Sequence, residues 1–188
     1  MNNGIDIDIL YRDLDEFAKG IAETVEQFQA RNGYTTCMWH NLKNCKILFD
    51  RTGRLTNLQE KYNIPYPEQL QKNIIDRNIR LLRTGMPAYE MQIAKAVKRR
   101  DLVSINHRTA EFLASYFDII FALNGLTHPG EKRLIDLCVK ECKLLPDYFK
   151  PNLEGLFGNL FTCPEQVTVW LDRIIRELET VLEASNDR

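Results

Sequence analysis

The chain has 188 residues, of which 44% are hydrophobic and 27% charged, and its 25 Lys and Arg nearly balance its 26 Asp and Glu. This composition is typical of a folded globular protein and argues against wholesale disorder and against a general basic surface for nucleic acid. No apolar run approaches the ~18 residues of a membrane span, and the first residues lack the basic-then-apolar pattern of a signal peptide. We therefore expect a cytoplasmic protein with no membrane and no nucleic-acid partner.

The first fifty residues predict a strand, a helix and a second strand. Gly4 to Tyr11 alternates Ile and Asp with a period of two, which is typical of a strand. Asp13 or Asp15 then caps a helix that we expect to run to about Ala30, and Cys45 to Asp50 forms a second, short β-type run. Two strands are too few for a stable free-standing sheet, because an isolated pair of strands is only marginally stable in water.

After Arg54 the apolar residues repeat only with helical periods. A short helix is expected over Leu55–Tyr62, and six further segments follow, separated by Pro and Gly. These segments are Glu68–Arg83, Pro87–Arg100, Leu102–Leu123, Pro129–Leu144, an irregular Tyr148–Leu160 and Pro164–Ala184. Leu102–Leu123 is apolar over most of its circumference, so we place it, with Phe117 and Phe121, at the centre of a bundle.

The predicted fold class is mainly α, with two parts. A small α/β remnant (strand-helix-strand) occupies residues 1–64, and a C-terminal bundle of about five or six helices occupies residues 65–188. Five cysteines, an odd number, argue against a secreted disulfide framework. Cys37, His40 and Cys45 could contribute to a soft metal site, but no second ligand pair follows at zinc-finger spacing.

Two aspartates of the first predicted strand are candidate metal ligands. Asp6 and Asp8 would point to the same face, since alternate residues of a strand do. Two neighbouring carboxylates repel each other unless a cation relieves them, and Mg²⁺ is the usual cation where phosphates are handled. A solvated strand face is the alternative, and we favour it for the pair taken alone.

A second candidate site follows the most apolar helix. That helix ends at Asn124, and a new helix is expected to open near Pro129 with Lys132 and Arg133 in its first turns. Unpaired N–H groups at a helix start beside two cations make an anion site, to which His128 could contribute. The alternative is a simple turn with both cations in solvent, since cations are unfavourable at a helix N-terminus.

A third pattern is loosely that of some helical ribonucleases. Arg100 would polarise a phosphate and His107 would move a proton. Such spacing arises easily by chance, and a solvated basic helix end is the alternative that we favour.

Four segments together resemble a known family. They are IDILYRDLDEF, WHNLKNCKILFDRTGRL, YPEQLQKNIIDRNIRLL and SYFDIIFALNGLTHPGEKRLI, and the resemblance covers the chain from about Ile7 to Leu160. They resemble bacterial nucleotidyltransferase-like proteins, in which a helical domain of unknown function follows a minimal nucleotidyltransferase domain. The resemblance implies a helical bundle packed behind an α/β catalytic layer, as in a transferase of this class.

The resemblance also implies roles for single residues. Asp8 matches the third metal-binding carboxylate of the wider superfamily, and Asp6 would replace it if the register is shifted by two. The Gly-Ser turn and the first Asp-x-Asp pair of that superfamily have no counterpart in this chain.

We therefore expect the C-terminal, substrate-side portion of a nucleotidyltransferase-like protein, which is inactive alone and partners an N-terminal catalytic domain in a longer chain. Mg²⁺ would bind only together with that missing part, and a small molecule or nucleotide would be the ligand, with His128, Lys132 and Arg133 as its contacts. A non-catalytic protein-interaction module is one alternative, and a helical-bundle ribonuclease that uses Arg100 and His107 is the other.

Overall fold

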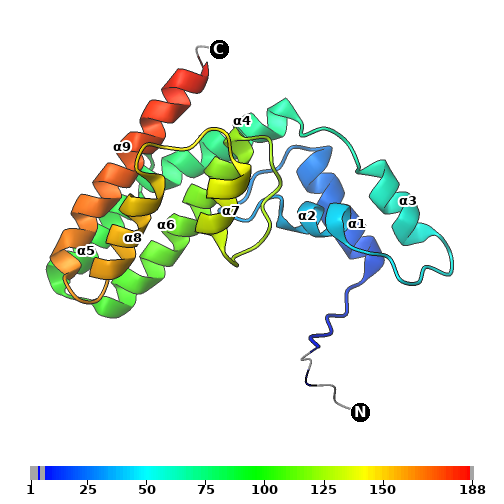
Figure 1. Cartoon of the computed structure of the whole chain (residues 1–188), viewed down its shortest axis with the longest axis horizontal. Helices are drawn as coiled ribbons and strands as arrows, with labels where there is room; N and C mark the ends of the chain where they lie inside the picture. The colour runs from blue at the N-terminus through cyan, green and yellow to red at the C-terminus, as the bar shows by residue number, and fades with distance from the viewer. Residues whose placement is uncertain (1–3, 5–6, 187–188) are drawn as a thin grey trace.

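The computed structural model describes Gly4 and residues 7–186, and within this part the chain is mainly helical and contains no strand. Figure 1 shows a group of helices around α6, with α1 to α3 at the opposite end of the molecule. None of the helices in the described part combines the length and apolarity that crossing a bilayer requires. The described elements are α1 (Leu14–Val25), α2 (Cys37–Asn44), α3 (Arg54–Lys61), α4 (Glu68–Ile79), the π-helical turn η1 (Arg80–Thr84), α5 (Tyr89–Arg99), α6 (Leu102–Leu123), α7 (Leu134–Glu141), α8 (Phe149–Asn159), the 3-10 turn η2 (Pro164–Gln166) and α9 (Val167–Asn186).

The two strands of the predicted strand-helix-strand layer are wrong for the described residues, whereas its helix is confirmed as α1, which Asp13 caps and which ends at Val25 instead of near Ala30. Residues 7–13 and 45–50 form no strand, and α2 occupies the stretch just before residue 45, for which the sequence predicts no element. Their apolar side chains lie in solvent, with Ile9 68% and Phe49 77% exposed. A period-two pattern becomes a strand only where a neighbouring strand accepts its backbone hydrogen bonds, and the described part supplies none.

Buried apolar side chains form two clusters that share helices. The smaller cluster surrounds Trp39 of α2 and includes Ile21 of α1, Leu70 of α4 and Ala122 of α6. The larger cluster is built from α5, α6, α8 and α9, and Ile75 of α4 packs against both clusters. The division of the chain at residue 64 stays a prediction, but α4 and α6 contribute to the cores on both sides.

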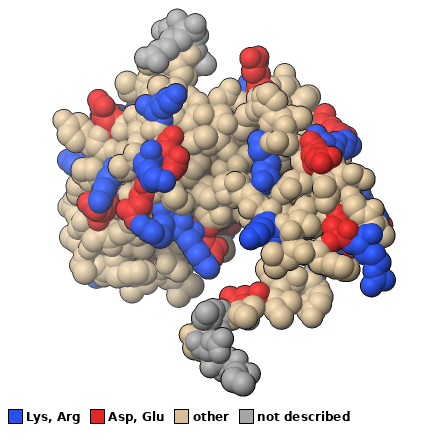
Figure 2. All heavy atoms as spheres, turned by 45° about the vertical axis from the view of Figure 1, so that its right-hand side comes forward, with Lys and Arg blue, Asp and Glu red and all other residues tan. Residues whose placement is uncertain are grey.

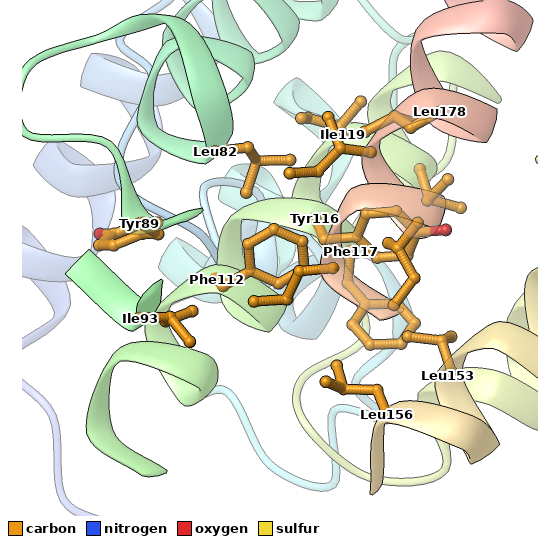
Figure 3. Packing of buried hydrophobic residues seen from close by; sticks show 14 of the residues in the cluster. Leu82, Tyr89, Ile93, Phe112, Tyr116, Phe117, Ile119, Leu153, Leu156 and Leu178 are labelled. Carbon is orange, nitrogen blue, oxygen red and sulfur yellow. The ribbon is translucent and has the colours of Figure 1, made fainter. Parts of the chain in front are cut away.

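Helix α6 is the centre of the larger cluster, as its composition predicts. Figure 3 shows its Phe112 directed toward Leu82 and Ile93, while Phe117 lies on the side of Leu153 and Leu156. Phe117 is 4% exposed and Phe121 is 3% exposed, so the prediction that both are buried is confirmed. The helix begins at Asp101, whose carboxylate accepts hydrogen bonds from the backbone N–H and hydroxyl of Ser104, as an N-cap does.

A partly buried arginine connects the elements around this core. Arg83 of η1 contacts Glu90 of α5 at 2.9 Å, Asp172 of α9 at 2.7 Å and Glu179 of α9 at 3.1 Å. Glu90 binds both Nε and Nη2 of the planar guanidinium, Asp172 shares Nη2 and Glu179 binds Nη1, so a single side chain fixes η1 against two helices.

Candidate functional site

The turn after α6 is fixed to the segment before α2 by His128. The backbone N–H of His128 donates to Thr36 Oγ1 at 2.8 Å, and His128 Nδ1 accepts from the Gly130 N–H at 3.1 Å. The ring is fully buried between Tyr34 and Phe121, with centroid distances of 4.8 and 5.0 Å. Burial lowers the pKa of His128 to about 4, so the ring is neutral near pH 7. His128 therefore holds the turn in place and does not reach the surface.

The two cations of this turn lie on the surface. The prediction of a helix from Pro129 is wrong, because α7 begins only at Leu134. Gly130 has φ 104° and Arg133 has φ 57°, and both left-handed conformations interrupt a right-handed helix. Arg133 lies 3.5 Å from Asp136 in the first turn of α7, and Lys132 is exposed. The structure brings Lys132 and Arg133 to one surface turn without the His128 ring, and their anion site stays a prediction.

A pocket of about 510 Å³ lies beside this turn, between α6, α7 and α8. Tyr34, which precedes α2, completes its wall, and we call it the Tyr34 pocket. Its lining is mostly apolar and comes from Leu113, Ala114, Phe117, Leu134, Ile135 and Phe157. A volume of this size and an apolar lining with a few charged groups are typical of small-molecule sites.

Charged side chains from three elements surround the apolar lining. Arg133 is paired with Asp136, and Lys150 lies 3.7 Å from Glu154 one turn further along α8. Glu131 also lines the pocket and has no ion pair or hydrogen bond in the described part of the chain. The rim therefore carries one more carboxylate than cations.

A buried polar network, which sequence reasoning missed, positions Tyr34. Asp118 of α6 is 1% exposed and accepts from the Thr35 N–H at 3.1 Å, the Thr35 hydroxyl at 2.7 Å and Asn78 Nδ2 at 3.3 Å. Asn78 of α4 in turn accepts from the Gly33 N–H at 3.1 Å. Burial raises the pKa of Asp118 to about 7, although the donors oppose the shift.

Gly33 fits this network because of its missing side chain. Its φ is 84°, and a Cβ atom there would lie 2.8 Å from the backbone carbon of Ala114 on α6. Any larger residue would push the segment away from α6 and thus move Tyr34. The signal in the sequence was a single Asp within the apolar run SYFDIIF, which begins one of the four segments that carry the family resemblance.

The acidic and metal candidates are dispersed. Asp8 is exposed in the segment before α1, and Asp6 lies outside the described residues. Over Gly4 and residues 7–186, no group of three or more His, Cys, Asp or Glu side chains is arranged to hold a metal ion. His40 Nδ1 lies 2.8 Å from Thr127 Oγ1, so this ring contacts the turn instead.

Arg100 and His107, the two residues with ribonuclease-like spacing, do not contact each other either. Arg100 ends α5 in a left-handed conformation, whereas the exposed His107 lies 3.8 Å from Glu111 one turn further along α6. No hydrogen bond or ion pair connects Arg100 with His107.

The Asp118, Asn78 and Thr35 side chains of this network and the His128 turn lie within the region that matches a known protein family, whereas Gly33 and Tyr34 lie just before it. The family model described as Domain of unknown function (DUF4037) matches residues 35–133, slightly more than half of the chain. No curated protein matches the chain, and neither does any solved structure. The charges on the face in Figure 2 are of both signs and interspersed, so that face offers no extended basic patch for nucleic acid.

Proposed function

Because the chain belongs to the family described as Domain of unknown function (DUF4037), we propose that it is the C-terminal, substrate-side portion of a nucleotidyltransferase-like protein. In this proposal the chain is inactive alone, and an N-terminal catalytic domain of a longer chain covers part of its surface. The family match supports the domain, and the resemblance of the four sequence segments supports the nucleotidyltransferase setting.

The observation that carries the proposal is a pair of exposed apolar segments that lead into α1 and α3, two helices whose starts are joined. Ile9 precedes α1 and Phe49 precedes α3, and both side chains are exposed. The starts of these two helices are joined by the ion pair between Arg54 and Asp15. Figure 1 shows the first segment running away from the helices. Exposed apolar side chains gathered in this way are typical of surfaces that another domain covers.

The segment over residues 7–11 has the sequence pattern of a strand and no strand partner in the described part. In the proposal it adds to the edge of the catalytic domain's sheet, since an extended segment can complete a sheet through its backbone hydrogen bonds. Asp8, or Asp6 in the shifted register, would then face the catalytic centre. Asp8 alone does not make a magnesium site, so Mg²⁺ would be held only together with carboxylates of the catalytic domain.

The Tyr34 pocket is the proposed place for the acceptor of the nucleotide. Arg133 lines this pocket, and the exposed Lys132 precedes it in the same turn without lining the pocket. Both would contact the anionic nucleotide. The buried His128 would act only indirectly, because its two hydrogen bonds hold the turn that carries both cations.

The test compares the isolated chain with the longest reading frame that contains it. The isolated chain, incubated with Mg²⁺, labelled nucleoside triphosphates and hydroxyl or amine acceptors, should transfer nothing. The longer chain should contain a Gly-Ser turn followed by an Asp-x-Asp strand, and it should transfer nucleotide. Asp8→Asn should abolish that transfer, whereas Asp147→Asn, at an exposed position in the loop before α8, should leave it unchanged.

Turnover by the isolated chain that Asp8→Asn abolishes would contradict the proposal. A reading frame without those motifs, with no transfer by any form, would favour the alternative of a non-catalytic interaction module, which the same exposed segments would serve. Ile9→Asp separates binding from folding. It should leave the melting temperature of the isolated chain unchanged, because the side chain is exposed, and weaken the association with the catalytic domain.

A further inference from the structure

The charges around the Tyr34 pocket discriminate between ligands. Both cations of the rim already have a carboxylate nearby, Arg133 through Asp136 and Lys150 through Glu154. An anionic ligand would have to compete with these carboxylates. Glu131 has no such partner in the described part, so a cationic ligand could pair with this carboxylate without displacing a cation from it.

The walls of the pocket also suit a cation with an apolar body. Tyr34, Phe117 and Phe157 contribute three aromatic rings, and the negative faces of such rings attract ammonium groups. The Tyr34 ring is held by its contact with His128 at 4.8 Å and by the hydrogen bonds of the adjacent Thr35. Burial raises the pKa of Tyr34, and the charge of Glu131 adds to this shift, so the carboxylate is close enough to influence the phenol.

We propose that the Tyr34 pocket binds a small amphipathic organic cation, with an apolar or aromatic body against Phe117 and Phe157 and one ammonium group paired with Glu131. The volume of about 510 Å³ lies within the usual range for small-molecule sites. The inference rests on the proposed function only in taking this pocket as the binding site of the acceptor. Binding of the cation itself requires no nucleotide transfer.

The test uses three probes with one body and different head groups: 4-phenylbutylamine, 4-phenylbutan-1-ol and 4-phenylbutanoate. Each is titrated into the full chain at pH 7 and low salt by calorimetry. The amine should bind about tenfold more tightly than the alcohol, since a partly exposed ion pair and an aromatic wall both favour it. The carboxylate should bind most weakly.

Two variants locate the effect. Glu131→Gln should lower the affinity for the amine to that for the alcohol and leave the alcohol unchanged, whereas Glu183→Gln, at an exposed position on α9, should change neither. Ala110→Phe, on the exposed edge of α6 that lines the pocket, should weaken all three probes by filling it.

Four results would overturn the inference: a preference for the carboxylate, equal affinities for the three probes, binding that Ala110→Phe does not weaken, and no binding. A preference for the carboxylate would instead support the anion site at Lys132 and Arg133. The titration measures binding alone, so a negative result would say nothing about nucleotide transfer. A negative transfer assay would likewise say nothing about the binding of the amine.

Discussion

Asp118 should make the stability of the fold depend on pH in a direction opposite to that of ordinary carboxylates. Burial raises its pKa from the ordinary value of 3.8 to about 7. The folded state therefore keeps the proton between about pH 4 and pH 7, where the unfolded chain has released it. The stabilisation is fully present below pH 4 and is lost as the pH rises through 7, by at most about 4 kcal/mol for a shift of this size.

Asp118→Asn removes this titration while keeping the shape of the side chain. At pH 5 the variant should be about 1–3 kcal/mol less stable than the parent, because the NH2 group of the amide cannot accept from Asn78 Nδ2, whereas either oxygen of the protonated carboxyl can. Between pH 5 and pH 8 this deficit should shrink by roughly 2 kcal/mol or more, because the parent loses stability as Asp118 ionises in its buried site. Urea unfolding followed by circular dichroism at several pH values measures both quantities.

The comparison with the parent is needed because His128 titrates in the same range with the opposite sign. Its pKa is lowered to about 4, so its contribution is present above pH 6.5 and is lost as the pH falls toward 4. This contribution is common to parent and variant and cancels in their difference. Asp147→Asn, at an exposed position, is the control and should give a difference that does not change with pH. A deficit for Asp118→Asn that stays constant within about 0.5 kcal/mol would refute the reasoning.

Three further predictions concern the helical core, and urea unfolding tests each of them. Phe117→Ala should cost about 3–5 kcal/mol, because the side chain is buried at the centre of the larger cluster, and a loss below about 0.5 kcal/mol would contradict this placement. Gly155→Ala should cost about 1–3 kcal/mol, because its Cβ atom would lie 2.7 Å from the indole of Trp170, whereas Gly158→Ala on the same helix meets open space and should gain up to about 1 kcal/mol. Equal stabilities of these two variants would show that the indole moves aside freely. Arg83→Met should cost about 1–3 kcal/mol after allowing for its partial exposure, because three carboxylates lose their shared cation, and a neutral result would mean that solvent replaces it fully.

Local sequence signals were sufficient for the helical part of the fold. The bounds of α6 agree with the prediction because both ends are marked by residues that act locally, Asp101 as the N-cap and Asn124-Gly125 after the last turn. The start of α7 was predicted too early, since Pro129 favours a helix start but says nothing of the left-handed backbone at Arg133. The strands failed for a related reason, because a period-two pattern does not contain the partner that a strand needs.

The candidate site depends on contacts that no local pattern contains. The partners of Asp118 are Asn78 and Thr35, which lie 40 and 83 residues away in the chain. The Tyr34 pocket likewise combines the loop before α2 with three helices. Sequence reasoning identified Arg133 at the edge of this pocket from its position after a buried helix. It did not single out Glu131, two residues earlier, as a ligand contact, because a carboxylate in a surface turn is usually only solvated.

The two clusters that share α4 and α6 also divide the chain's two tryptophans between them. Trp39 lies inside the smaller cluster, with its indole N–H donating to the Tyr62 carbonyl at 2.9 Å, while Trp170 packs against the larger one. Trp39→Phe and Trp170→Phe thus leave one fluorophore in each cluster. Since Ile75 of α4 contacts both, loosening either cluster uncovers part of the other. The shared helices thus couple the two clusters into one cooperative unit. The fluorescence of Trp39 and of Trp170 reports on each of its two ends separately.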